Sequence, residues 1–215
     1  MPAYNNNLSS DKPMVEGKRL LICITGMPGA GKSTVAILLR NYGFSLITMG
    51  DVVREQAKLN NLEMTDANLG NLMLKLRKDL GPAAVAHLIL KKIKQDSGMK
   101  RDIVIDGIRS IDEVKVLKTI GSVRLLAIHA SAETRYNHIK QRGRADVPQD
   151  NTDFLIRDQR EIDVGISEAI AMSDEVVSNN NLTMAELQNK VLGIVRKWLD
   201  NIDSINNGSP RNYEQ

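Results

Sequence analysis

Cysteine, aromatic residues and histidine are all scarce in this sequence of 215 residues. Its one cysteine, Cys23, excludes a disulfide framework or a multi-cysteine metal site built within one chain. Aromatic residues make up 3% of the chain, which argues against a surface that stacks the bases of single-stranded nucleic acid. The three histidines are scattered, with no cysteine or carboxylate cluster around them, so a histidine metal site has little support.

Long apolar runs and a strong charge of either sign are also missing. No stretch approaches the roughly 18 apolar residues that a membrane span needs, and the polar beginning of the chain does not resemble a signal peptide. The net charge of +3 is too small to indicate a DNA-binding surface. We therefore expect a cytoplasmic protein without a membrane or nucleic-acid partner, and the sequence does not indicate its oligomeric state.

Short aliphatic runs alternate with longer amphipathic segments along the middle of the chain. The runs predicted to be strands are LLICIT (20–25), SLIT (45–48), DIVID (102–106), VRLLAIHA (123–130) and DEVVS (174–178). This alternation predicts an α/β fold, a five-stranded and mainly parallel sheet with helices on both faces. The length favours one domain, residues 18–200, and the polar ends, residues 1–17 and 201–215, are predicted to be disordered extensions.

Several helices have recognisable starts. Ser110 with Glu113, and Thr183 with Glu186, have the spacing of a capping box, in which a hydroxyl and a carboxylate satisfy unpaired backbone donors reciprocally. From Thr65, apolar residues recur at helical spacing until a Gly-Pro pair interrupts them. These signals predict helices that begin near Thr65, Ser110 and Thr183.

A glycine-rich segment, GMPGAGKST at residues 26–34, follows the first predicted strand directly. It matches the phosphate-loop pattern G-x-x-x-x-G-K-S in full and precedes a plausible helix, so backbone donors and a helix dipole converge on one anionic site. The pattern predicts that ATP binds here, that Lys32 reaches its β- and γ-phosphates as a catalytic group, and that Ser33 holds Mg²⁺. The predicted nucleotide-binding residues are Gly26, Met27, Pro28, Gly29, Ala30, Gly31, Lys32, Ser33 and Thr34.

A second anion is needed to orient the water shell of the metal. Asp106 ends the predicted strand DIVID and is the candidate, contacting Mg²⁺ directly or through water. The alternative is that Asp106 caps the next turn.

A phosphate loop by itself indicates only that a nucleotide binds. Small-molecule kinases add an early acceptor site, an arginine after the acidic strand and a basic lid, and all three have candidates. The candidates are Gly50, Asp51 and Arg54 for the acceptor site, Arg109 after Asp106, and Arg142, Arg144 and Arg157 for the lid.

The segments GMPGAGKST, TMGDVVR and IDGIRS together resemble those of nucleoside monophosphate kinases, particularly adenylate kinases with S-T-G-D-x-x-R and D-G-F-P-R. Over roughly residues 18–200 the pattern is most similar to an archaeal adenylate-kinase-related family of phosphate-loop proteins. The resemblance implies a three-layer P-loop fold with an acceptor-binding insert at about 50–95 and a short helical lid at about 141–165. Met49 stands where adenylate kinases usually have threonine, and Arg109 comes one residue early, which leaves the acceptor open.

The resemblance implies that Arg54 and Arg109 hold the phosphate of the acceptor, and that Arg142 and Arg144 close over the phosphoryl group being transferred. The expected catalytic groups are Lys32, Arg109, Arg142 and Asp51. Asp51 is not needed as a base if the acceptor is a phosphate, but it would help a hydroxyl acceptor.

The basic residues also have plainer interpretations. Arg77 could line the acceptor site, but it lies opposite an apolar stripe and is expected to face water. Arg54 lies in an exposed helical pattern, in which many arginines are simply solvated. The remaining lid residues could form surface ion pairs. These candidates are Arg142, Arg144, Arg157 and Arg160, with Asp146, Asp153, Asp158 and Glu161.

The function that we predict is an ATP- and Mg²⁺-dependent phosphotransferase whose partners are a nucleoside triphosphate and a small, nucleotide-like phosphorylated acceptor. The alternative is a dephospho-coenzyme A kinase, because SDEVVSNNN resembles the A-D-x-V-I-x-N segment of those enzymes. An alternative of another class is a regulatory nucleoside triphosphatase or nucleotide-binding module.

Overall fold

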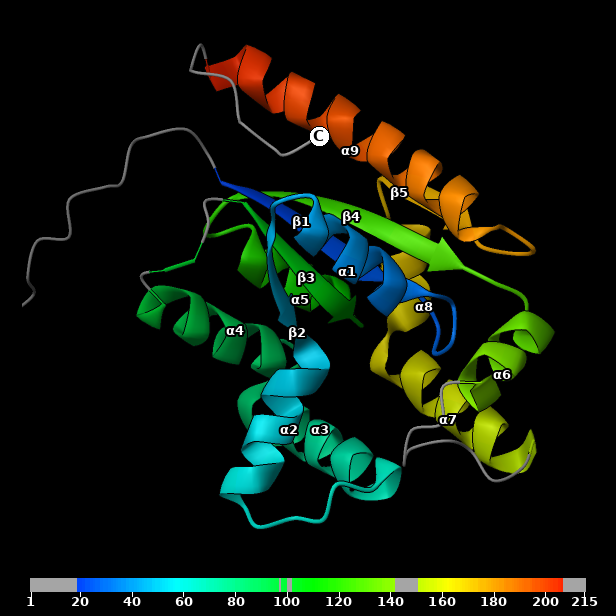
Figure 1. Cartoon of the computed structure of the whole chain (residues 1–215). Helices are drawn as coiled ribbons and strands as arrows, with labels where there is room; N and C mark the ends of the chain where they lie inside the picture. Colours follow the sequence, from blue (N-terminus) through cyan, green and yellow to red (C-terminus); the bar gives the residue numbers. More distant parts are fainter. Residues whose placement is uncertain (1–18, 97, 100–101, 142–150, 207–215) are drawn as a thin grey trace, which may run out of the picture.

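The computed structural model describes residues 19–96, 98–99, 102–141 and 151–206, and it contains the predicted five-stranded sheet (Figure 1). The strands are β1 (Leu20–Thr25), β2 (Ser45–Thr48), β3 (Ile103–Ile108), β4 (Ser122–His129) and β5 (Glu175–Ser178). Their order is β2-β3-β1-β4-β5, and every neighbouring pair is parallel. The α/β fold predicted from the alternating pattern is confirmed.

Helices connect the strands and cover both faces of the sheet (Figure 1). They are α1 (Lys32–Asn41), α2 (Met49–Leu59), α3 (Asp66–Leu80), α4 (Ala84–Gln95), α5 (Ile111–Leu117), α6 (Ala132–Gln141), α7 (Asn151–Val164), α8 (Ile166–Ala171) and α9 (Met184–Asn206). The predicted start signals are confirmed: the hydroxyl of Thr65 accepts from the Asn68 amide, Ser110 and Glu113 form a capping box, and Thr183 caps α9.

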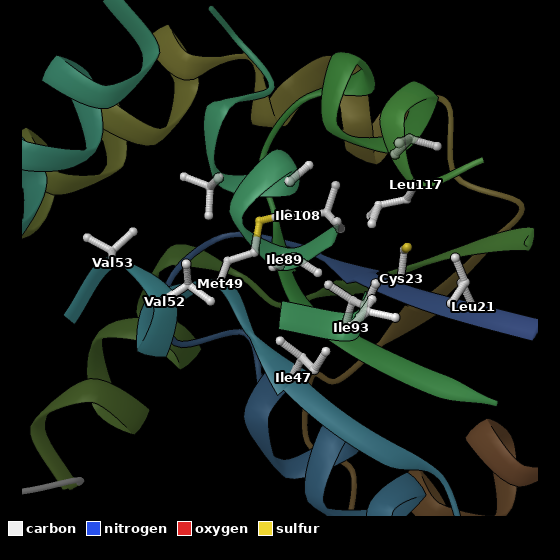
Figure 2. Close-up of a cluster of buried hydrophobic side chains, with 14 of the residues drawn as sticks. Leu21, Cys23, Ile47, Met49, Val52, Val53, Ile89, Ile93, Ile108 and Leu117 are labelled. Atoms are coloured by element: carbon white, nitrogen blue, oxygen red, sulfur yellow. The ribbon is translucent and has the colours of Figure 1, made fainter. Parts of the chain in front are cut away.

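Two hydrophobic clusters lie on the two faces of the sheet. Leu21 and Cys23 of β1 pack with α2, α3, α4 and α5 on one face (Figure 2), whereas Leu20 and Ile22 pack with α1 and α9 on the other. A parallel strand covered on both faces needs apolar side chains in every position, which explains the unbroken run LLICIT. Burial raises the pKa of the Cys23 thiol far above its ordinary value, so this cysteine acts as a small core residue.

The last helix is longer than predicted. Residues 201–206, which were assigned to a disordered tail, continue α9 to Asn206. Ile202 is buried and extends the apolar face formed by Val195, Trp198 and Leu199, so packing against the sheet carries the helix past residue 200. The remaining predicted extensions, residues 1–18 and 207–215, lie outside the described residues.

Two regions assigned to substrate binding have definite places in the fold. The predicted acceptor insert consists of α2, α3 and α4, between β2 and β3. The described part of the predicted lid is the end of α6 and the whole of α7. Arg142, Arg144 and Asp146 fall within residues 142–150, outside the described residues, so their predicted roles stay predictions.

Candidate functional site

The phosphate loop joins the end of β1 to the start of α1 and depends on three glycines. Gly26, Gly29 and Gly31 have φ angles of 136°, 83° and 106°, which favour glycine over other residues. A Cβ atom on Gly29 would lie 2.5 Å from the carbonyl oxygen of Arg135. A Cβ atom on Gly31 would lie 2.5 Å from the side-chain nitrogen Nδ2 of Asn179. Close packing from α6 and from the segment after β5 therefore fixes the shape of the loop.

Lys32 begins α1 and folds over the loop. Its Nζ donates to the carbonyl oxygen of Gly26 at 2.6 Å and to that of Met27 at 3.1 Å. Gly31 is the N-cap residue of α1, so the first amides of the helix point toward the same space. The loop thus combines an ammonium group and a helix N-terminus, which is an arrangement that binds phosphate groups.

Asp106 lies beside the loop within β3, where its backbone is in register with Ile24 of β1 and Thr48 of β2. It was expected to end its strand, but β3 continues to Ile108. The hydroxyl of Ser33 donates to Asp106 Oδ2 at 3.2 Å, and Asp106 Oδ1 is buried without a hydrogen-bond partner. A buried carboxylate oxygen of this kind suits a cation or a water bound to one.

In the part of the chain that the structure describes, Asp106 does not belong to a metal site made only of protein ligands. Among the described residues, no group of three or more His, Cys, Asp or Glu side chains is placed to hold a metal ion. Ser33 and Asp106 fit a Mg²⁺ ion that takes its other ligands from nucleotide phosphates and water, as Mg²⁺ commonly does.

One cavity of about 350 Å³ contains most of the predicted site. The predicted acceptor residues Gly50, Asp51, Arg54 and Arg109 line it together with the loop and with Asp106. From the loop, the lining residues are Gly26, Pro28, Gly29, Lys32 and Ser33, and the lid candidate Arg157 also lines the cavity. The remaining loop residues are outside the lining: Met27, Ala30, Gly31 and Thr34 form the backbone turn and the first turn of α1.

Asp51 is held by Thr48, the N-cap residue of α2, and by Arg54 within α2. Its Oδ2 accepts a 2.5 Å hydrogen bond from the hydroxyl of Thr48, and its Oδ1 lies 2.5 Å from Nη2 of Arg54. Partial burial acts to raise the pKa of Asp51, but the hydrogen bonds from Thr48 and Arg54 outweigh it, and the pKa is lowered. Asp51 is therefore an ionised group at the cavity wall, and the half-exposed Arg54 is its ion-pair partner rather than a freely solvated residue.

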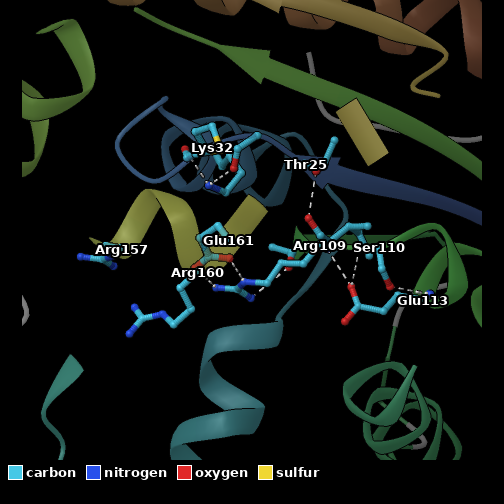
Figure 3. A network of polar contacts seen from close by, with 12 residues as sticks. Thr25, Lys32, Arg109, Ser110, Glu113, Arg157, Arg160 and Glu161 are labelled. Carbon is cyan, nitrogen blue, oxygen red and sulfur yellow. Dashed lines mark hydrogen bonds and ion pairs between the residues drawn. The ribbon is translucent and has the colours of Figure 1, made fainter. Parts of the chain in front are cut away.

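Arg109 is fixed by Glu161 of α7 (Figure 3). Its Nε donates to Glu161 Oε2 at 2.5 Å, and its Nη1 donates to the carbonyl oxygen of Gly107 at 3.2 Å. Burial opposes both charges, but the attraction between Arg109 and Glu161 outweighs it, raising the pKa of the arginine and lowering that of the glutamate. The alternative in which Glu161 forms a surface ion pair with a lid arginine is wrong, because this carboxylate is buried where α7 meets Arg109.

Arg77 is also paired rather than facing water. Only 9% of its side chain is exposed, and it forms an ion pair with Glu113, which is fully buried. Burial lowers the pKa of Arg77, opposed by the charge of Glu113. Glu113 further accepts hydrogen bonds from the backbone amides of Arg109 at 2.8 Å and Ser110 at 3.3 Å. The expectation of a solvated Arg77 was wrong, because α3 packs close to the capped start of α5, and this capping box fixes the backbone of Arg109.

Arg135 of α6 is a site residue that sequence reasoning missed. It donates to the carbonyl oxygen of Pro28 at 3.1 Å, pairs through two hydrogen bonds with Asp158 of α7, and lies over the ring of Phe154. In the alternative interpretation Asp158 was a possible surface partner of a lid arginine, but its partner is Arg135 and the pair is largely buried. No local pattern distinguishes Arg135, because the loop and α7 meet it only in the folded chain.

Asn179 supports the loop from the other side. Its side chain is buried and donates to the carbonyl oxygen of Ala30 at 3.0 Å. It belongs to the segment SDEVVSNNN, whose resemblance to kinase sequences was the available signal. Arg157 and Arg160 both reach Asp66 of α3, an acid that the sequence had not indicated as a partner.

Comparison with known proteins agrees with this geometry. A family model described as an AAA domain matches residues 25–155. A UPF0200 protein of Methanocaldococcus jannaschii is 39% identical over 184 residues, covering 86% of this chain and 93% of that protein. The chain belongs to the UPF0200 family. Another UPF0200 protein, from Pyrococcus horikoshii, is 38% identical over 185 residues and covers 85% of this chain and 99% of the relative.

Solved structures share the fold of this UPF0200 chain at lower identity. TT1252 from Thermus thermophilus superimposes with a TM-score of 0.62 at 18% identity, covering 85% of this chain and 98% of that one. Shikimate kinase from Acinetobacter baumannii, solved with shikimate, gives a TM-score of 0.51 at 14% identity, covering 84% and 94%. The UPF0200 chain thus has a kinase-like P-loop fold. No described helix combines the length and apolar character that crossing a membrane requires.

Proposed function

We propose that this protein is an ATP- and Mg²⁺-dependent phosphotransferase whose acceptor is a small, nucleotide-like phosphorylated molecule, as in nucleoside monophosphate kinases. The observation that carries the proposal is the shared cavity: the phosphate loop, Asp106 and the Gly50–Arg54 segment line one space of about 350 Å³. A donor phosphate on the loop and an acceptor beside α2 would meet there without an intervening element.

The donor side needs positioning and positive charge rather than covalent chemistry, because the transferred phosphoryl group is loosely bonded in the transition state. Bound Mg²⁺ would supply charge neutralisation on the phosphate oxygens. Lys32 would exchange its hydrogen bonds to the Gly26 and Met27 carbonyls for bonds to phosphate oxygens, and the first amides of α1 would donate to the same group. Ser33 and Asp106 would orient the metal and its waters.

The acceptor side offers cations of two kinds. Arg54 is half-exposed, so its ion pair with Asp51 can be exchanged for a phosphate at small cost. Arg109 is held by Glu161 and Gly107, and it would present its charge from a fixed position. Arg157 lines the same cavity from α7 and would add a third positive charge.

A hydroxyl acceptor, as in a dephospho-coenzyme A kinase, is the second candidate. It is favoured by one observation: the carboxylate of Asp51 lies on the wall of the same cavity. Despite partial burial, the hydrogen bonds from Thr48 and Arg54 lower the pKa of Asp51 and so weaken it as a base, and Asp51 would have to exchange them before it accepted the proton of an attacking hydroxyl.

A transfer screen tests the proposal. Purified protein with Mg²⁺ and ATP is offered AMP, CMP, UMP, GMP, the deoxynucleotides and dephospho-coenzyme A separately, and both ADP and phosphorylated acceptor are quantified. Stoichiometric transfer to one acceptor supports the kinase and identifies its substrate. ADP release without any phosphorylated product would contradict it and favour a regulatory triphosphatase.

A further inference from the structure

Two arginines of α7 converge on one carboxylate of α3. Arg160 Nη2 lies 2.8 Å from Asp66 Oδ2, and Arg157 Nε lies 3.6 Å from Asp66 Oδ1. The two arginine side chains are 20% exposed or less, whereas Asp66 is 36% exposed. Figure 3 shows Arg160 extending from α7 away from the Arg109–Glu161 pair. Arg160 therefore points to a different carboxylate from the one that holds Arg109.

Gly70 makes room for Arg160. It lies in the interior of α3, where glycine is less favourable than alanine. A Cβ atom at this position would collide with Nη1 of Arg160. The guanidinium group thus lies close to α3 at Gly70, and its Nε is buried without a hydrogen-bond partner. Gly70 therefore lowers the intrinsic stability of α3 at the turn that contacts this arginine.

The arginines border a second cavity of about 90 Å³. Gly50, Arg54 and Arg109 line both this cavity and the larger one, so the two are contiguous. Four arginines and two carboxylates line the smaller cavity. Arg54 pairs with Asp51 and Arg109 with Glu161, so Asp66 is the carboxylate that faces both Arg157 and Arg160, and its departure would leave an excess of two positive charges. Of the two carboxylates, Glu161 is buried against Arg109, whereas Asp66 is partly exposed and can leave. The cavity is therefore matched to a small dianion.

We propose that Arg157 and Arg160 form an anion subsite for the acceptor, and that Asp66 occupies the place of the acceptor's phosphate monoester in the ligand-free protein. This inference rests on the proposed function, since it presumes that an acceptor binds beside α2. A partly exposed ion pair is worth little, while a phosphate can take charge-assisted hydrogen bonds from two guanidinium groups. Asp66 thereby keeps the arginines oriented when the site is empty and competes with the acceptor, setting its affinity.

The test measures binding of inorganic phosphate by calorimetry, with the phosphate loop of the full-length protein filled by a non-hydrolysable ATP analogue and Mg²⁺. Asp66→Asn removes the competing charge and is expected to tighten phosphate binding severalfold. Arg160→Gln is expected to weaken it about tenfold, the effect of one charge-assisted hydrogen bond. Gly70→Ala changes no charge but displaces Arg160, and it should weaken binding as well.

Arg124→Gln is the matched control, because Arg124 is also a partly exposed arginine, pairs with Asp174 at 3.5 Å and lines neither cavity. It should leave phosphate binding unchanged. Thermal unfolding and binding of the ATP analogue establish that each variant is folded. Equal phosphate binding by wild type, Asp66→Asn and Arg160→Gln, or no binding by any of them, would overturn the inference and leave Asp66 as a brace between helices. Failure of the wild-type protein to bind the ATP analogue would instead refute the proposed function.

Discussion

Arg109 and Glu161 lie 52 residues apart in the chain and meet with 2.5 Å between Nε and Oε2. The contact joins the end of β3, beside the phosphate loop, to α7 in the predicted lid. Glu161 is 4% exposed, and its charge is balanced at close range by the arginine. This pair therefore belongs to the interior of the site, and its removal should affect stability.

Glu161→Gln is expected to destabilise the protein by about 3 kcal/mol, because breaking a buried ion pair leaves Arg109 without a charge partner. Urea unfolding followed by circular dichroism measures the change. Asp112→Asn removes an exposed pair with Lys115 and serves as the control, for which no measurable loss is expected. A loss equal to that of the control would show that the pair is not coupled to folding.

The same pair predicts how stability depends on pH. Burial acts to raise the pKa of Glu161 in the folded protein, but the charge and hydrogen bond of Arg109 outweigh it, so the pKa is lowered. The stabilisation is thus complete above the unfolded value of about 4.3 and is lost as the pH falls through the folded pKa. The difference in unfolding free energy between wild type and Glu161→Gln should be constant from pH 6 to 8 and shrink below about pH 4. A difference that grows on acidification would contradict this assignment.

Lys32→Ala is expected to reduce turnover by about 10²–10³-fold, since it removes a cation from the phosphate oxygens without removing core packing. The rate of ADP formation measures the effect, and the unfolding midpoint should stay close to that of the wild type. Lys91→Ala, at an exposed position of α4, is the control. An unchanged rate for Lys32→Ala would show that the phosphate loop takes no part in the reaction.

Gly29→Ala tests the shape of the loop. The backbone at φ 83° and the carbonyl of Arg135 both oppose a side chain, so a destabilisation of about 2 kcal/mol and a large loss of nucleotide affinity are expected. Gly193→Ala is the matched control, because a Cβ there meets nothing within 4 Å in α9 and should stabilise the helix by about 1 kcal/mol. Thermal unfolding and titration with ATP distinguish the two outcomes.

Asp106→Asn tests the proposed metal position. The amide removes a negative charge beside Ser33, so binding of ATP with Mg²⁺ should weaken by about tenfold. Binding of ATP in EDTA should change little or tighten, since a repelling carboxylate has gone. Equal losses with and without Mg²⁺ would show that Asp106 supports the loop rather than the metal.

Local patterns were sufficient for much of this molecule. The five strands, the capped starts of α3, α5 and α9, and the phosphate loop all follow from residues that are close together in sequence, because hydrogen-bonding periodicity and turn geometry act over a few residues. The motif segments also brought Arg54, Asp106 and Arg109 to one cavity, as the resemblance to kinases implied.

The sequence by itself therefore determined the sheet, the loop and the kind of ligand that the loop can hold. Only the tertiary structure decided which carboxylate faces each arginine: Glu113 for Arg77, Asp158 for Arg135, Glu161 for Arg109 and Asp66 for Arg160, over separations of 36, 23, 52 and 94 residues. From the sequence pattern, an arginine on the polar face of a helix could pair with any of several acidic residues. Its actual partner depends on which helix faces come into contact when the two hydrophobic clusters pack. The same packing carried α9 to Asn206, where composition alone had suggested a disordered tail.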